Sequence, residues 1–218
     1  DIYLGAKLKY MQADNGVWCW TLNPSKYVQE ACKNCETFLK NNFDGKYSMP
    51  KHAPNPFVGG YRPEIDTTDA LDPDRASYYQ TLIGVMRWML DLGRVDIATE
   101  CSLLSSHLAY PREGHFECAL NMMAYLRVKH NSHLFFDPTY PEIDFDSSND
   151  GAEWKAFYGD VTKAIPDNAP EPRGKPVNLR MWVGSDHAGD KETRRSRTGY
   201  FIYMNTVLID WLSKLNAL

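Results

Sequence analysis

The sequence predicts an α+β protein, in which a helical region with an N-terminal β-hairpin is followed by a three-stranded antiparallel meander. Three observations predict this class. Apolar residues recur at helical spacing across residues 73–92 and 111–130. Asn15-Gly16, a strong hairpin-turn signal, separates two β-rich runs near the start. Three further β-rich runs with short connections follow residue 176, which indicates a meander.

The N-terminal elements follow from local patterns. The runs Ile2–Met11 and Val17–Leu22 flank the Asn-Gly turn and predict the two hairpin strands. Residues 23–40 predict an amphipathic helix, because Tyr27, Ala31, Cys35 and Leu39 share one face. Cys32 and Cys35 form a CxxC pair on that helix. No second pair or nearby histidine completes a zinc site, so we expect both to pack in the core. Residues 41–74 are rich in Pro, Gly and Asp and predict a long irregular segment.

The middle of the chain predicts three helical segments. Asp72 or Asp74 can cap the first, and Gly93 ends it. Residues 95–109 predict the second, which the Tyr110-Pro111 step terminates. The third covers residues 111–130, and residues 132–137 then predict a short strand.

The remainder divides into a linker and the meander. Residues 137–176 contain six prolines and nine acidic residues against four basic ones, which predicts a linker with one short helix at Ala152–Tyr158. The meander strands are predicted at Val177–Val183, Tyr200–Met204 and Val207–Ser213. We therefore divide the chain into residues 1–136, the linker 137–176, and residues 177–218.

Composition limits the classes of function. The 218 residues carry a net charge of −4, which argues against long-range attraction of the whole chain to nucleic acid. Residues 177–218 alone carry six basic and four acidic residues, so any such attraction must be local. An odd number of cysteines, with no signal peptide and no long apolar run, predicts an intracellular protein, cytoplasmic or nuclear, with no membrane partner. The chain starts at Asp1 and stops just after a predicted strand, so we expect it to be an excerpt of a longer protein.

The candidate site lies in the stretch Arg180–Met204. Asp186 follows a predicted strand, with His187 and Asp190 close by, which is where a metal-dependent nuclease holds its first ligand. A two-metal site needs several carboxylates, so the alternative is that Asp186 and Asp190 are solvated turn acids. The cluster of basic residues that follows offers contacts for phosphate groups; it comprises Lys191, Arg194, Arg195 and Arg197. The alternative is a charged turn whose arginines pair with Asp190 and Glu192. No phosphate-binding or dinucleotide-binding loop occurs, so no small-molecule cofactor is expected.

The order of these motifs resembles the region that follows the polymerase palm in Ty1/copia-type retrotransposon polyproteins. The matching motifs are the "YLGAKL" strand, the "YYQTLIG" helix, the Arg94-x-Asp96-Ile97-Ala98 segment and the Tyr125-Leu126-Arg127 step. The stretch "SDHAGDKETRRSRTGYFIYM…LIDWLSK" is similar to the opening of that family's ribonuclease H domain. The resemblance covers essentially the whole chain.

The resemblance implies a late reverse transcriptase region, thumb and connection, over residues 1–136 and an incomplete ribonuclease H-like sheet over 177–218. In the intact polyprotein, such a segment would handle an RNA–DNA template–primer, with Lys191, Arg194, Arg195, Arg197, Arg127 and Lys129 as candidate nucleic-acid contacts. Mg²⁺ is expected for the intact parent enzyme, but no cofactor is assigned to this chain.

The chain departs from the family pattern at the catalytic positions. It contains no Asp-Asp pair of the polymerase type. Gly184 occupies the position of the first ribonuclease H acid, which leaves Asp186 as the candidate catalytic and metal-binding residue. Either Asp186 substitutes in a shifted register or this copy has decayed. We therefore expect no polymerase or nuclease activity from this chain alone, and the alternative function is a decayed or co-opted, non-enzymatic interaction or structural fragment.

Overall fold

The protein is described by a computed structural model that covers residues 1–43, 45–142, 159, 164, 166–171 and 173–216. The predicted helix at Ala152–Tyr158 lies outside these residues. The fold is α+β, with four α-helices and two antiparallel sheets in the described part of the chain. None of the described helices is long and apolar enough to cross a membrane.

The N-terminal sheet has four strands in the order β1-β2-β3-β4: β1 (Ile2–Tyr3), β2 (Ala6–Gln12), β3 (Trp18–Asn23) and β4 (Leu134–Phe136). The Asn15-Gly16 turn joins β2 to β3 as predicted, and Gly16 has a positive φ of 83°. The first predicted strand is interrupted, however. Leu4 and Gly5 both adopt positive φ, so the chain reverses there and β1 folds back onto β2.

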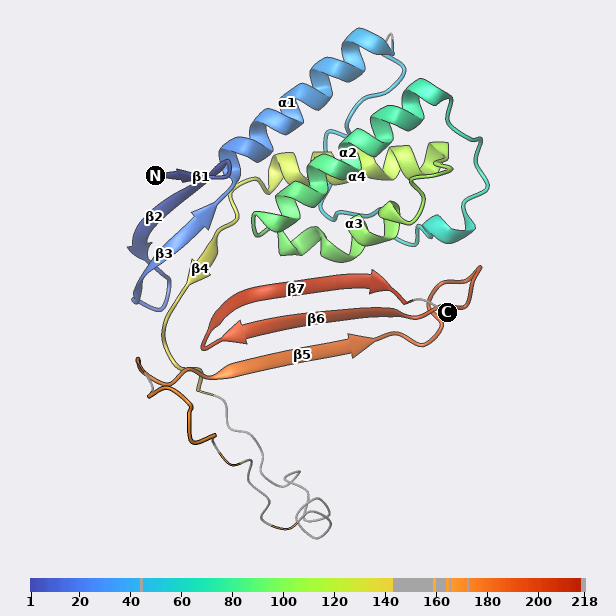
Figure 1. Cartoon of the computed structure of the whole chain (residues 1–218). Coiled ribbons are helices and arrows are strands. Elements are labelled where there is room, and N and C mark those ends of the chain that lie inside the picture. Colours follow the sequence, from blue (N-terminus) through green and yellow to red (C-terminus); the bar gives the residue numbers. More distant parts are fainter. Residues whose placement is uncertain (44, 143–158, 160–163, 165, 172, 217–218) are drawn as a thin grey trace.

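The helical body consists of α1 (Ser25–Asn42), α2 (Pro73–Asp91), α3 (Ala98–Ser105) and α4 (Glu113–Val128), with short 3₁₀ turns at Pro63–Ile65 and Val95–Ile97. Its boundaries follow the predicted signals. The Asp72 carboxylate accepts a 2.9 Å hydrogen bond from the Arg75 backbone N–H and caps α2. Gly93, with φ of +96°, turns the chain after α2. Figure 1 shows α1, α2 and α4 side by side, and their apolar faces form one core around Tyr79, Met86, Phe116, Met123 and Leu126.

The Arg94–Asp96 motif anchors the corner between α2 and α3. The Arg94 side chain is fully buried and donates to both Asp96 oxygens, from Nε at 2.9 Å and from Nη2 at 2.7 Å. The Tyr125 hydroxyl on α4 donates to the same carboxylate at 2.9 Å. Burial opposes ionisation of Asp96, but these hydrogen bonds and the charge of Arg94 outweigh it, so the pKa of this carboxyl lies below its usual range. The motif therefore links three helices.

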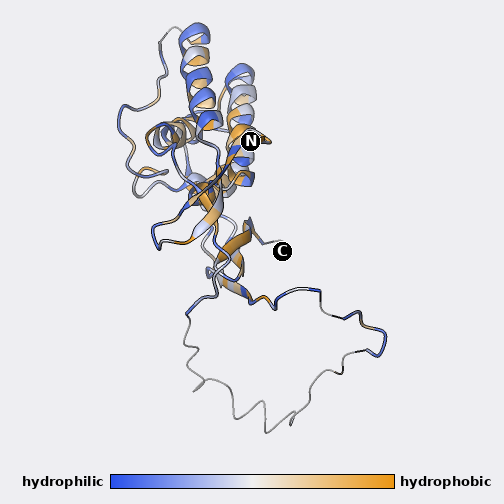
Figure 2. Ribbon diagram, turned by 90° about the vertical axis from the view of Figure 1, so that its left-hand side faces the viewer, coloured by the Kyte–Doolittle hydropathy of each residue, from blue (hydrophilic) through white to orange (hydrophobic). Residues whose placement is uncertain are grey.

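The C-terminal sheet is the predicted meander, with strands β5 (Leu179–Ser185), β6 (Arg197–Met204) and β7 (Val207–Leu215) in that order. Each strand begins or ends within a few residues of its predicted limits. Asn205 adopts a positive φ of 56° in the turn between β6 and β7, as suits an asparagine. Figure 2 shows the apolar character of these strands against the hydrophilic outer faces of the helices.

The C-terminal sheet is attached to the body along β7. This strand lies beside α3 and also meets β4, while β5 lies farthest from the helices (Figure 1). We call this contact between the C-terminal sheet and the body the seam. At one end of it, the Thr206 hydroxyl donates to the Asp137 carbonyl at 2.7 Å and Asn205 Nδ2 donates to the Pro138 carbonyl at 3.1 Å. At the other end, Arg197 Nη1 donates to Ser102 Oγ on α3 at 2.5 Å. Within the described strands of this sheet, Val207 is the one buried residue.

Candidate nucleic-acid interface

Asp186 lies just beyond β5 at the start of the β5–β6 turn. Its backbone N–H donates to the Arg197 carbonyl at 3.1 Å, and its Oδ1 accepts the Arg197 backbone N–H at 2.6 Å. The Asp186 side chain therefore joins the two ends of the β5–β6 turn. Gly184, two residues earlier, lies within β5 and is exposed.

Asp190 also supports the turn. Its Oδ1 accepts backbone N–H groups from Glu192 at 3.1 Å and from Thr193 at 2.7 Å. Burial opposes ionisation, but these hydrogen bonds outweigh it and hold the pKa of Asp190 below its usual range. Within the described ranges, no group of three or more His, Cys, Asp or Glu side chains is placed to hold a metal ion. Asp186 and Asp190 each use one carboxylate oxygen, Oδ1, to accept hydrogen bonds from backbone N–H groups of the turn.

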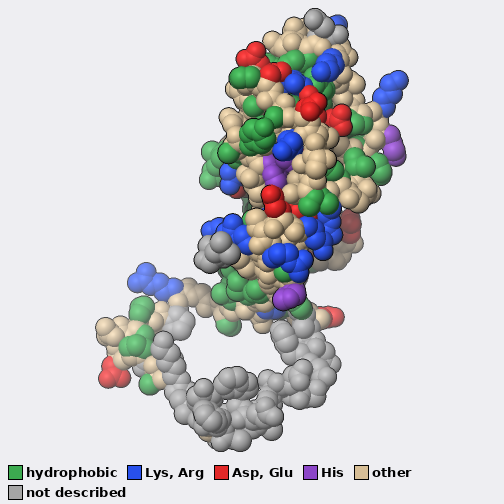
Figure 3. Space-filling view, turned by 90° about the vertical axis from the view of Figure 1, so that its right-hand side faces the viewer, with side chains coloured by type: hydrophobic (Ala, Val, Ile, Leu, Met, Phe, Trp, Pro, Cys, Tyr) green, Lys and Arg blue, Asp and Glu red, His purple; other side chains and the backbone are tan. Residues whose placement is uncertain are grey.

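The four basic residues of the β5–β6 turn separate into two kinds. Arg195 Nε donates to the Asn216 carbonyl at 2.8 Å, and Arg197 is half-buried against Ser102. These two arginines hold the turn and the seam. Lys191 and Arg194 are exposed, and Arg194 adopts a positive φ of 58° at the turn. Figure 3 shows Lys and Arg side chains gathered at this end of the sheet.

The two candidate residues on α4 also differ. Arg127 donates to Glu36 Oε1 at 2.5 Å and to the Pro50 carbonyl at 2.7 Å, so it ties α1 and the irregular segment 45–62 to α4. Lys129, at the C-terminal end of α4, is exposed. The structure thus leaves Lys191, Arg194 and Lys129 at the surface and uses Arg127, Arg195 and Arg197 internally.

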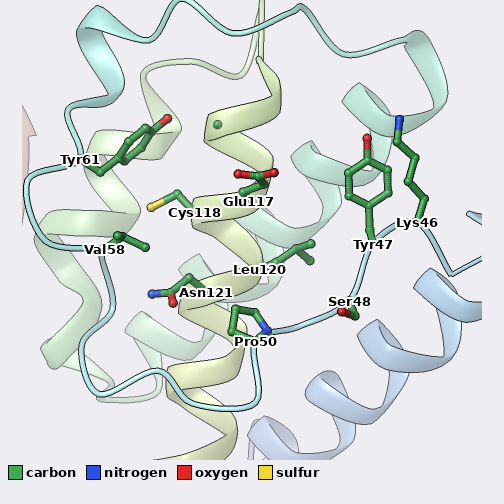
Figure 4. A pocket seen from close by; sticks show the side chains of 11 residues that line it. Lys46, Tyr47, Ser48, Pro50, Val58, Tyr61, Glu117, Cys118, Leu120 and Asn121 are labelled. Carbon is green, nitrogen blue, oxygen red and sulfur yellow. The ribbon is translucent and has the colours of Figure 1, made fainter.

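Segment 45–62 covers a hollow of about 420 Å³ against α4 (Figure 4). Its best-defined polar groups already have partners inside the protein. Asn121 Nδ2 donates to the carbonyls of Asn55 and Pro56, and the Tyr61 hydroxyl donates to Asp66 Oδ2. The hydroxyl of Tyr47 donates to Glu113. These bonds fix the segment on the body, while the side chains of Lys46, Ser48 and Glu117 also line the hollow.

An aromatic ladder on the N-terminal sheet was not among the sequence candidates. We define it as Tyr10, Trp18 and Trp20, each more than half exposed. The Tyr10 ring centroid lies 5.7 Å from that of Trp18 and 5.6 Å from that of Trp20. Tyr10 lies directly opposite Trp20, and Phe136 on β4 flanks Trp20 on its other side. The side chains of Tyr10, Trp18 and Trp20 thus form an aromatic surface open to solvent, with the Tyr10 and Trp20 rings tilted by 58°.

The signal for the ladder was present in the predicted hairpin. With Asn15-Gly16 at the turn, Tyr10 and Trp20 fall opposite each other, and Trp18 projects to the same face because side chains alternate along a strand. The exposure of that face could not be predicted. It depends on which face of the sheet packs against the rest of the molecule, and Cys19 and Thr21 on the opposite face are buried.

Comparison with protein-family models, with curated proteins and with solved structures finds no significant match for this chain.

Proposed function

We propose that this chain is part of a copia-type reverse transcriptase and ribonuclease H polyprotein, in which it helps to hold an RNA–DNA template–primer without performing the chemistry. The exposed aromatic ladder is the observation that carries this proposal. Aromatic side chains on a sheet surface bind nucleobases by stacking, and each stacked base contributes about 1–3 kcal/mol whatever its identity. A contiguous patch of exposed apolar side chains is typical of an interaction site.

The exposed basic residues supply a second, electrostatic contact. Lys191 and Arg194 are both exposed, so their charged groups are open to contact with phosphate oxygens. They lie at the end of the C-terminal sheet opposite the N-terminal hairpin (Figure 1). Contact with both surfaces requires an extended nucleic acid, and affinity should weaken steeply with salt because counterions are released from the phosphates.

The candidate catalytic position supports a role in binding. Gly184 has no carboxylate, and Asp186 fastens the β5–β6 turn through its backbone and side-chain bonds to Arg197. We therefore derive no hydrolytic step from this chain, and Mg²⁺ belongs to the proposed intact parent enzyme. The protein would act within the cell, in the cytoplasm or nucleus.

A second candidate function is protein binding without any role in nucleic-acid handling. The nearly even charge of residues 1–136, with 14 basic and 15 acidic side chains, favours it. Aromatic surfaces are also frequent in protein interfaces. The two candidates differ in their response to salt and to charge reversal.

The test is fluorescence anisotropy of a labelled RNA–DNA hybrid with a single-stranded overhang, titrated with the chain at several salt concentrations. The double variant Trp18→Ala/Trp20→Ala should lower affinity at every salt concentration, by roughly tenfold or more. Trp88→Ala is the matched control, since Trp88 is a partly exposed tryptophan on α2, outside the ladder.

Charge reversal provides the second arm of this experiment. Lys191→Glu/Arg194→Glu should weaken binding and flatten its dependence on salt, whereas Lys33→Glu on α1 should change neither. Failure of the unmodified chain to bind, or equal affinity in the ladder variant and the Trp88→Ala control, would count against the proposal and favour the protein-binding function.

A further inference from the structure

Segment 45–62 forms a fixed rim around the hollow on α4. Its first limb is held where the Tyr47 hydroxyl donates to Glu113 at 2.9 Å. Farther along, Asn121 Nδ2 donates to the Asn55 carbonyl at 3.0 Å. Because both bonds join the segment to the same helix, a ligand can enter the hollow without first ordering the chain, which favours binding.

Gly114 allows the second limb of the segment to close on the helix. A Cβ at Gly114 would collide with the Asp66 carboxylate and would lie 3.1 Å from the Tyr61 hydroxyl. Tyr61 donates to Asp66 at 2.6 Å, so this bonded pair packs directly against the α4 backbone. The helix therefore forms the floor of the hollow, and the two limbs of the segment form its walls (Figure 4).

The floor of the hollow presents hydrogen-bond acceptors. Gly114, Glu117, Cys118 and Asn121 follow one another at three- and four-residue steps, which places them on one face of α4. Glu117 is exposed. The Asn121 nitrogen donates to two backbone carbonyls, which fixes the amide and leaves its Oδ1 as an acceptor. Burial raises the pKa of the Cys118 thiol to about 12, so this thiol stays protonated and does not act as a nucleophile at neutral pH.

The wall formed by the first limb carries hydrogen-bond donors. Lys46 is exposed, and its ammonium lies 5.1 Å from the centroid of the Tyr47 ring. The exposed Ser48 adds a hydroxyl two residues later. The other lining side chains are largely apolar and comprise Pro50, Val58, Leu120 and the ring of Tyr61. The hollow thus combines a positive wall, an acceptor-bearing floor and apolar surface between them.

We propose that the hollow binds a single nucleotide whose base carries an exocyclic amino group. The base would lie against the apolar lining, and its amino group would donate to the Glu117 carboxylate, a pairing that also reads cytosine in DNA. A sugar hydroxyl would donate to Asn121 Oδ1, and the phosphate would accept from the Lys46 ammonium. The volume of about 420 Å³ suits a small molecule, since such sites span about 300–1,000 Å³.

The two signs of charge select this class of ligand. A simple anion would bind Lys46 but leave the Glu117 carboxylate without a donor, and a simple cation would be repelled by Lys46. A nucleotide has an acceptor end, a donor end and a flat apolar body between them. The site goes beyond the proposed function, because the nucleotide binds as a small molecule, apart from the aromatic ladder. No local motif signals the site, since its walls and floor come from segments far apart in the sequence.

Isothermal titration calorimetry of the unmodified chain tests the choice of ligand. Cytidine monophosphate should bind about tenfold more tightly than uridine monophosphate, which carries a carbonyl oxygen in place of the amino group. Cytidine and inorganic phosphate, which each lack one end of the ligand, should bind more weakly than cytidine monophosphate. Equal affinity for the two nucleotides, phosphate binding as tightly as the nucleotide, or no nucleotide binding at millimolar concentration would overturn the proposal.

Two exposed side chains separate the two ends of the site. Glu117→Ala should lower the affinity for cytidine monophosphate about tenfold and leave that for uridine monophosphate nearly unchanged. Lys46→Ala should lower the affinity for both nucleotides by a similar factor and leave cytidine binding unchanged. Glu171→Ala and Lys33→Ala are the matched controls, at exposed positions outside the hollow, and should change neither affinity. Equal losses in a site variant and its control would refute the assignment.

A filling variant tests the place of binding. Ser48→Trp adds an indole at the exposed rim and should abolish nucleotide binding, while far-UV circular dichroism checks that the helices are retained. Unchanged binding in this variant would place the nucleotide elsewhere and refute the site. Trp18→Ala/Trp20→Ala should leave the affinity for cytidine monophosphate unchanged, because the ladder lies on the N-terminal sheet. Failure of this site and failure of hybrid binding are therefore distinguishable.

Discussion

The helical body and the C-terminal sheet are stabilised by different interactions. In the body, four helices share one apolar core, and buried polar side chains such as Arg94 and His115 form hydrogen bonds within the fold, although Arg94 Nη1 is buried without a partner among the described residues. In the sheet, regular backbone pairing between three strands carries the structure, while half of the strand residues are exposed and Val207 alone is buried. The body is therefore stabilised mainly by burial of apolar surface. The C-terminal sheet is stabilised mainly by the backbone hydrogen bonds between its strands and by its contacts with α3 and β4.

This difference predicts where substitutions will matter. Truncating a buried side chain in the body loses its transfer free energy and leaves a cavity, whereas truncating an exposed side chain in the sheet does neither. The same exposure makes the C-terminal sheet available to partners, as the aromatic ladder is on the N-terminal sheet.

The largest expected effect compares two phenylalanines. Phe116 on α4 is 0% exposed and Phe201 on β6 is 41% exposed. Phe116→Ala should lower the free energy of unfolding by about 3–5 kcal/mol, and Phe201→Ala by less than about 1 kcal/mol. Urea denaturation followed by far-UV circular dichroism measures both variants against the unmodified chain. Losses of similar size would show that the sheet buries more surface in solution than the monomer structure indicates.

The elements of the fold were predictable from sequence where local chemistry determines them. Asp72 caps α2 and Gly93 follows it, and Asn15-Gly16 forms the turn between β2 and β3. The reversal at Leu4 was missed, because leucine seldom adopts a positive φ and only the glycine after it hinted at a turn. The pairing of Trp20 with Phe136 was also missed, since it joins segments far apart in the sequence.

The candidate site was less predictable, because side-chain partners come from remote segments. A cluster of basic residues in sequence predicts charge but not availability. Arg197 is held by Ser102 and Arg127 by Glu36, contacts that no local pattern reveals. Lys191 and Arg194 are exposed at the surface, and their proposed role in binding nucleic acid stays a prediction.

A pH-dependent effect of intermediate size is expected where the body meets the β5–β6 turn. His107 stacks on His115 with ring centroids 4.2 Å apart. Burial, followed by the charge of His115, lowers the pKa of His107 to about 4, against opposing attraction from Asp190, Glu64 and Asp66. The folded state therefore disfavours a proton that the unfolded chain accepts at its usual pKa of about 6.5. Stability should be fully present above that value and should fall as the pH drops from about 6.5 towards 4.

Urea denaturation at pH 7, 6 and 5 measures this loss, which should be about 1–2 kcal/mol because the ring is only partly shielded from solvent. His107→Gln should flatten the dependence, whereas His52→Gln, at an exposed position, should preserve it. An unchanged slope in His107→Gln would assign the loss to other groups. Asp96 and Asp66 act in a lower range, since their carboxyl pKa values are depressed and their contribution is lost only below the usual carboxyl pKa.

The smallest expected effect tests whether the C-terminal sheet can unfold locally while the helical body stays folded. Thr206→Val removes the hydroxyl that donates to the Asp137 carbonyl at 2.7 Å while keeping the side-chain shape. Because one seam bond is lost and a carbonyl loses its donor, docking of the sheet should weaken by about 1 kcal/mol. Amide hydrogen exchange should then accelerate about fivefold in β6 and β7, with little change in α2 and α4. Thr81→Val is the control, since the Thr81 hydroxyl bonds within α2 to the Ser77 carbonyl. Equal acceleration in the helices would mean that body and sheet unfold as one unit, and the contrast between them would then concern burial alone and not cooperativity.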